Sequence, residues 1–162
     1  KAALMQEIYV AGYPFGDYYS SSVKVTKGIV SALSGVGNNF SNFQIDAALQ
    51  PGNSGGPVID EKGNLIGVAV AKLDQSKTFD DFGSLPENTN FAIKTGVVMN
   101  ILDAAKIEPR PANERKLSRD KLANLITNST FHVTCFMTES QIKEIQSQAE
   151  KDKVLFKNIK LN

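Results

Sequence analysis

The strongest constraint on the fold is the way short apolar runs alternate with turn-forming residues up to about residue 93. The runs are rich in Val, Ile, Tyr and Phe, and clusters of Gly, Pro, Asn, Asp and Ser separate them. This pattern is typical of an all-β barrel or sandwich. The expected strands are 8–11, 23–33, 43–45, 57–59, 65–71 and 91–93. Six short strands predict one small antiparallel barrel.

One turn and one helix are predicted from local chemistry. Residues 60–64 read Asp-Glu-Lys-Gly-Asn, which is hairpin chemistry and predicts antiparallel pairing of the flanking strands. Val97, Val98, Ile101 and Leu102 recur near helical spacing, so residues 96–105 should form a helix that closes the barrel. We therefore expect the barrel domain to span residues 1–105.

The remaining residues are expected to form a linker and a small tail. Pro109 and Pro111 favour a stiff linker over 106–117. The pattern over 118–162 predicts a helix, a strand over 130–137 and a second helix over 139–151. So small an α/β tail has too little core to be stable alone, so it should dock on the barrel or on a partner.

Composition and charge exclude several classes of function. The net charge is +1, and no apolar run approaches the roughly 18 residues of a membrane-spanning helix. Residues 106–162 carry more basic than acidic side chains, but these are scattered as on a solvated surface, so we expect no nucleic-acid partner. With one cysteine and one histidine, the chain can form no internal disulfide and offers no zinc ligand cluster. We expect no cofactor and no metal.

The candidate catalytic residue is Ser54, in the sequence GNSGGP at 52–57. A serine nucleophile needs a base for its proton and fixed donors for the developing oxyanion. Glycines around Ser54 allow a sharp turn in which the amides of Gly52 and Ser54 point into one cavity. The alternative is an ordinary turn between two strands, because Gly, Asn and Ser are also common turn residues.

The same residues match the Gly-x-Ser-x-Gly nucleophile elbow of another fold. An elbow requires a strand before the serine and a helix after it. Here Pro51 precedes the motif, and the strand and hairpin over 57–64 leave no room for a helix. We therefore favour the barrel setting.

Several segments in order resemble the trypsin-like serine proteases of the HtrA/DegP family. They are IYVAGYPFG at 8–16, KGIVSAL at 27–33, QIDAA at 44–48, GNSGGP at 52–57, GNLIGV at 63–68 and NFAI at 90–93. Tyr13 stands where the family usually has Asn. The resemblance implies the second Greek-key barrel of a chymotrypsin-like fold, with Ser54 as nucleophile and the Gly52 and Ser54 amides as oxyanion hole.

The resemblance also implies what this chain lacks. The family's general-base His and orienting Asp lie in a first barrel outside these residues, so the isolated chain should be nearly inactive. The implied activity is hydrolysis of unfolded polypeptides by a serine endopeptidase. Trimeric assembly and a periplasmic or extracytoplasmic location are implied by the resemblance alone. The tail lacks the strands and carboxylate loop of the PDZ module that often follows in this family.

By the same resemblance, five residues border the substrate: Ala48, Leu49, Ala71, Lys72 and Leu73. Their small and aliphatic side chains predict a preference for small to medium apolar substrate residues. The main chain of residues 70–73 could accept an extended peptide as an added strand. Asn53 stands where trypsin zymogens carry an Asp, so activation by insertion of a new amino terminus is not expected.

His132 and Cys135 are alternative reactive residues in the tail. In the expected strand they face opposite sides, so they should not form a dyad. His132 is interpreted as a solvent-side histidine, and Cys135 as a small buried apolar residue. The rival function is a non-catalytic peptide-binding module, in which barrel and tail hold polypeptide without cleaving it.

Overall fold

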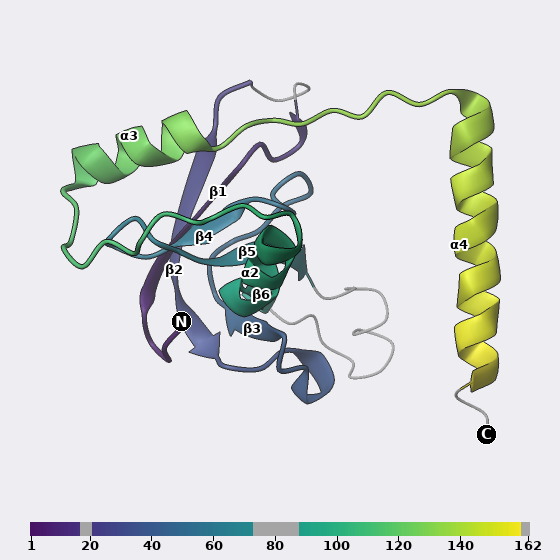
Figure 1. Ribbon diagram of the computed structural model, residues 1–162, viewed down its shortest axis with the longest axis horizontal. Coiled ribbons are helices and arrows are strands. Elements are labelled where there is room, and N and C mark those ends of the chain that lie inside the picture. Colours follow the sequence, from purple (N-terminus) through teal and green to yellow (C-terminus); the bar gives the residue numbers. More distant parts are fainter. Residues whose placement is uncertain (17–20, 73–87, 160–162) are drawn as a thin grey trace. The chain divides into compact units, whose positions relative to one another are not determined.

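The computed structural model shows a closed six-stranded antiparallel barrel followed by three helices (Figure 1). It describes the backbone of residues 1–16, 21–72 and 88–159, and the side chains within these ranges except at 71, 72 and 151–159. The strands are β1 (Glu7–Gly12), β2 (Lys24–Ala32), β3 (Asn42–Ile45), β4 (Pro57–Ile59), β5 (Leu65–Lys72) and β6 (Asn90–Lys94). Their order around the barrel is β1-β2-β3-β6-β5-β4. The predicted six-stranded barrel is confirmed.

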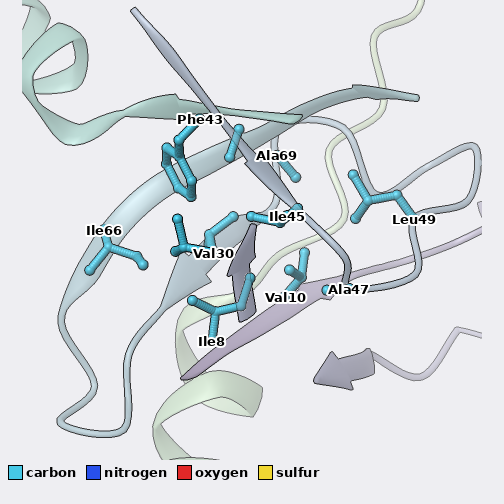
Figure 2. Packing of buried hydrophobic residues seen from close by; sticks show 11 residues of the cluster. Ile8, Val10, Val30, Phe43, Ile45, Ala47, Leu49, Ile66 and Ala69 are labelled. Carbon is cyan, nitrogen blue, oxygen red and sulfur yellow. The ribbon is translucent and has the colours of Figure 1, made fainter. Parts of the chain in front are cut away.

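Alternating side chains of the strands fill the barrel interior (Figure 2). Ile8 and Val10 of β1 point inward together with Phe43 and Ile45 of β3, because residues two apart in a strand share a face. Among the residues whose side chains are described, the largest fully buried side chain is Phe43, which lies against the backbone of β5 at Gly67. Burial of this apolar cluster supplies the main driving force for folding of the barrel.

The hairpin between β4 and β5 forms as its sequence predicts. Asp60 Oδ1 accepts hydrogen bonds from the amides of Lys62 and Asn64, both at 2.9 Å. The Asp60 amide donates to the Asn64 carbonyl at 3.0 Å. Side-chain acceptance by a turn aspartate replaces the ladder bonds that the backbone gives up there. The two strands pair antiparallel, with Val58 opposite Gly67.

The helices begin near the predicted positions. A short 3-10 helix (η2, Val36–Asn38) precedes β3, and the α-helices are α2 (Thr95–Ala104), α3 (Arg119–Ser129) and α4 (Glu139–Ile159). The Ser118 side chain caps α3 by accepting from the Lys121 amide. None of the described helices is both long and apolar enough to cross a membrane.

The predicted strand over 130–137 is wrong. Residues 130–138 have no regular secondary structure, and Cys135, predicted to be buried, is exposed. Strand propensity expresses packing on a sheet surface more than a backbone preference. A closed barrel offers few strand edges for another strand to pair with, and this β-rich run pairs with none of the described strands.

The chain divides into two compact units, Lys1–His132 and Val133–Asn162. Residues 106–132 therefore belong with the barrel, whereas the sequence pattern placed a boundary near residue 106. Leu122 and Ile126 of α3 are buried against Ala11 of β1 and Ile59 of β4. Helix α3 thus covers part of the outer surface of the barrel.

Polar contacts hold the approach to α3 on the β4–β5 hairpin. The Asn113 amide donates to Asn64 Oδ1 at 2.7 Å, and Asn64 Nδ2 donates to the Asn113 carbonyl at 2.9 Å. The Leu117 amide donates to the Glu61 carbonyl at 3.0 Å, and Lys116 pairs with the Glu61 carboxylate. These contacts place the start of α3 over the hairpin.

Candidate active site

Ser54 lies in the turn that leads into β4, with its side chain exposed to solvent. Its hydroxyl donates to the Val70 carbonyl of β5 at 2.9 Å. This bond holds the hydroxyl at the surface of the barrel, where the chain leaves the ladder between β4 and β5. The hydroxyl is accessible to a substrate, as a nucleophile must be.

Two glycines shape this turn because their backbones adopt the left-handed region. Gly52 has φ of 99° and Gly55 has φ of 85°, conformations that other residues adopt only at a cost in free energy. Gly52 also packs so closely on the Tyr13 carbonyl that a Cβ there would collide with it. A Cβ on Gly55 would meet no atom within 4 Å, so only its backbone conformation requires glycine.

The backbone hydrogen bonds of the turn leave two amides available. The Asn53 amide donates to the Gln50 carbonyl at 3.0 Å, and the Gly55 amide donates to the Ala69 carbonyl at 2.7 Å. Within the described part of the chain, the amides of Gly52 and Ser54 donate no hydrogen bond. These are the two donors that the predicted oxyanion hole uses, and that assignment stays a prediction.

Asn53 lies between these amides and is buried, with 5% of its surface exposed. Its side chain packs on Gly12 of β1, where a Cβ would come within 2.6 Å of Asn53 Oδ1. Among the described residues, this buried oxygen accepts no hydrogen bond. Asn53 therefore anchors the turn to β1 through packing.

The five residues assigned to the substrate occupy different environments. Ala48 is exposed, and its carbonyl accepts from Thr26 Oγ1 at 2.9 Å. Leu49 is 5% exposed and belongs to the core of the barrel. Ala71 and Lys72 lie at the end of β5, beyond Val70, and Leu73 lies outside the described residues. The substrate role of all five stays a prediction, and the burial of Leu49 shows that it also packs the core.

The chain's single histidine, His132, lies beside the turn at Tyr13–Gly16. The rings of Tyr13 and His132 are 5.6 Å apart at a tilt of 38°, and a Cβ on Gly16 would be 3.8 Å from His132 Nε2. Tyr13 Oη donates to the Thr130 carbonyl at 3.0 Å. Nothing in the sequence indicated this contact, because Tyr13 and Thr130 are 117 positions apart.

A cavity of about 410 Å³ lies between α3 and the strands β4 and β5. Gly55, Pro57 and Val68 line it on the barrel side, and Ile126 and Thr130 line it on the tail side. The cavity therefore reaches the residue that follows Ser54. Thr130 is buried, and its hydroxyl has no hydrogen-bond partner among the described residues.

Comparison with known proteins places this barrel in a protease domain. The trypsin-like peptidase domain family matches residues 1–68. A relative from Lactobacillus helveticus, serine protease Do-like HtrA, is 37% identical over 103 residues, which is 60% of this chain and 24% of that protein. The chain carries part of an HtrA-type, trypsin-like protease domain.

Two further relatives are similar to this chain. Protease Do-like 2, chloroplastic, from Arabidopsis thaliana is 36% identical over 104 residues, covering 61% of this chain and 15% of that protein. The uncharacterized protein y4bJ from Sinorhizobium fredii is 39% identical over 133 residues, covering 82% of this chain and 21% of that protein. This HtrA-type chain thus spans less than a quarter of each of these three relatives.

A solved structure of the HtrA-type protease AlgW with a decapeptide is similar to this chain at a TM-score of 0.49 and 31% identity. The similarity covers 64% of this chain and 30% of that chain.

Proposed function

We propose that Ser54 is the nucleophile of an HtrA-type serine endopeptidase that hydrolyses peptide bonds of unfolded polypeptides. One observation supports this proposal. An exposed Ser54 hydroxyl lies in the same glycine-shaped turn as the amides of Gly52 and Ser54, which donate to no atom of the described residues. A turn that only connects two strands would not require an exposed hydroxyl beside such amides. The similarity to HtrA-type proteases also supports a catalytic role.

The proposed chemistry is acyl transfer. Ser54 Oγ bonds to the substrate carbonyl carbon while its proton passes to a general base, and the carbonyl oxygen becomes an oxyanion. The Gly52 and Ser54 amides donate to that oxyanion, and each such donor contributes about 3 kcal/mol to transition-state stabilisation. The C–N bond then breaks, the amine leaves with the proton from the base, and water hydrolyses the acyl-enzyme.

The general-base His and the orienting Asp are proposed to come from outside these 162 residues. The ring of His132, the only histidine of the chain, lies against the ring of Tyr13, and we assign it no part in proton transfer. Because triad members act as a unit, the barrel alone retains only the contribution of the oxyanion donors and of substrate binding. The 162-residue chain is accordingly expected to be nearly inactive.

The substrate is proposed to bind as an extended strand along the end of β5. Strand β4 pairs with β5 from Leu65 to Val68, and none of the described strands pairs with the β4 side of β5 beyond Val70. This short edge begins at the carbonyl that accepts from the Ser54 hydroxyl. Main-chain addition there would bring a scissile bond to Ser54. By the family resemblance, the residues assigned to the substrate would favour small to medium apolar side chains: Ala48, Leu49, Ala71, Lys72 and Leu73.

Casein hydrolysis by the complete protein tests this proposal. Ser54→Ala should lower kcat by a factor of roughly 10⁵ to 10⁶, because loss of the nucleophile removes most of the catalysis. Ser41→Ala removes another exposed serine hydroxyl and should leave hydrolysis unchanged. Equal activity of Ser54→Ala and wild type would refute the nucleophile assignment.

The β5 edge also favours a second candidate function, peptide binding without cleavage. In that case, the complete protein would bind denatured casein with the same affinity in wild type and Ser54→Ala, and neither would cleave it. Trimeric assembly and an extracytoplasmic location are further proposals, which rest on the family resemblance alone. Sedimentation of the complete protein would test the trimer.

A further inference from the structure

Tyr13 connects the turn before residue 16 to the end of the tail segment that packs on the barrel. Its hydroxyl donates to the Thr130 carbonyl at 3.0 Å, although the two residues are 117 positions apart. Its ring lies 5.6 Å from the ring of His132. Thr130 is buried, with 5% of its surface exposed. The acceptor of this hydrogen bond therefore belongs to a buried residue.

The other side of the same turn holds the loop that carries Gly52. The Phe15 amide donates to the Pro51 carbonyl at 2.8 Å. Gly52 packs directly on the Tyr13 carbonyl. A Cβ at position 52 would also lie 3.1 Å from both the Phe15 amide nitrogen and the Pro14 Cα, so the turn leaves no room for a side chain there. The turn thus lies between Thr130 and His132 on one side and Pro51 and Gly52 on the other.

We propose that residues 130–132 position the Gly52 amide through Tyr13, so that the tail sets the geometry of the oxyanion donors. This inference rests on the proposed function, because it concerns the same donor. Tyr13 is a positioning residue in this account: it touches no substrate, and it acts by holding the turn against which Gly52 packs. An oxyanion donor must sit near 2.7–3.1 Å from the developing oxyanion, so a small shift of the turn weakens it.

Two observations favour a specific coupling. The Tyr13 hydroxyl reaches the Thr130 carbonyl at 3.0 Å across 117 positions of sequence. The relative y4bJ is similar to this chain over 133 residues. Only 105 residues precede the linker, so at least 28 matched residues lie beyond residue 105. The match therefore extends into the tail, so at least one relative retains sequence similarity in part of this segment.

Amide exchange in the 162-residue chain tests the coupling without any catalysis. The Phe15 amide reports whether the turn is docked on Pro51. Tyr13→Phe removes only the hydroxyl, and we expect the Phe15 amide to exchange about five-fold faster, since one hydrogen bond is lost. Tyr9→Phe makes the same chemical change on β1 and should leave Phe15 unchanged. The Ala69 amide, bonded to Gly56 within the barrel, is the internal reference.

Two results of this exchange experiment would overturn the proposal. One is an unchanged Phe15 amide in Tyr13→Phe. The other is equal acceleration of Phe15 and Ala69, because that would mean a general loss of stability and no local positioning. His132→Ala provides a second variant at the same contact, and it should accelerate Phe15 exchange in the same selective way.

Kinetics of the complete protein test the catalytic consequence. Tyr13→Phe should lower kcat about three- to ten-fold with KM unchanged, because an oxyanion donor acts in the transition state and not in substrate binding. A raised KM with unchanged kcat would overturn the positioning role. Failure of the proposed function gives a different pattern: Ser54→Ala would then be as active as wild type, whatever the exchange experiment shows.

Discussion

Ile126→Ala in α3 is the substitution that best tests how the tail segment contributes to the barrel. The Ile126 side chain is 4% exposed and packs with Leu122, Ile59 and Ala11. Removing about three methylene equivalents costs about 2.5 kcal/mol of transfer free energy. The vacated space joins the cavity of about 410 Å³ that Ile126 already lines, so little further cost arises from a new closed void. The total lies at the low end of the roughly 2–5 kcal/mol typical of such changes.

Calorimetric unfolding of the 162-residue chain measures this loss. For a unit the size of Lys1–His132, about 2.5 kcal/mol corresponds to a fall in Tm of roughly 10 °C. Thr127→Ala is the matched control, because residue 127 is exposed on the same helix, and its Tm should stay within about 2 °C of wild type. An Ile126→Ala Tm as close to wild type as the control would show that α3 adds no free energy to folding of the barrel.

Two further predictions concern the turn and the surface. Gly56→Ala should lower the free energy of unfolding in urea more than Gly55→Ala, because a Cβ at Gly56 collides with the Ala11 carbonyl. At Gly55 only the positive φ disfavours alanine, at a cost of about 1–2 kcal/mol. The reverse order would contradict the observed packing. The hydrogen bond from Lys27 holds the pKa of Glu7 below its usual value, so stability from this carboxylate is present above its unfolded pKa and is lost as pH falls through the lower folded value. Lys27→Ala should therefore raise the pKa of Glu7 in an NMR titration, and an unchanged pKa would show that the ion pair does not form in solution.

The strands were predictable because their signals are local. Alternation of apolar residues marks β1 and β3, and turn chemistry marks the hairpin at Asp60. Each observed strand agrees with its predicted range to within one residue at either end. Strand β2 is one residue shorter than predicted at both ends. The cap at Ser118 also depends only on nearby residues, so the start of α3 agrees with the helix predicted from the pattern over 118–162.

The tail could not be predicted in the same way, because its structure depends on what it packs against. Residues 130–137 have strand-like composition, but forming a strand requires a partner edge, and the described residues show none there. Cys135 was expected to be buried on the face of that strand, so its exposure follows from the loss of the strand. The contact between Tyr13 and Thr130 joins residues far apart in sequence, which no local pattern reveals.

The candidate site was predictable in its main residue and less so in its surroundings. The glycines around Ser54 indicated a sharp turn, and the positive φ values of Gly52 and Gly55 explain why glycine is needed. The sequence did not indicate that the Ser54 hydroxyl would donate to the Val70 carbonyl, because that partner belongs to another strand.

The most direct test of the central claim is fluorophosphonate labelling of the complete protein, followed by mass spectrometry of the modified peptide. The account predicts one adduct on Ser54 in the complete protein, and no detectable adduct on the isolated 162-residue chain, whose proposed base lies elsewhere. An adduct on another serine would contradict the assignment of Ser54. Strong labelling of the isolated chain that His132→Ala abolishes would contradict the claim that the base comes from outside this chain.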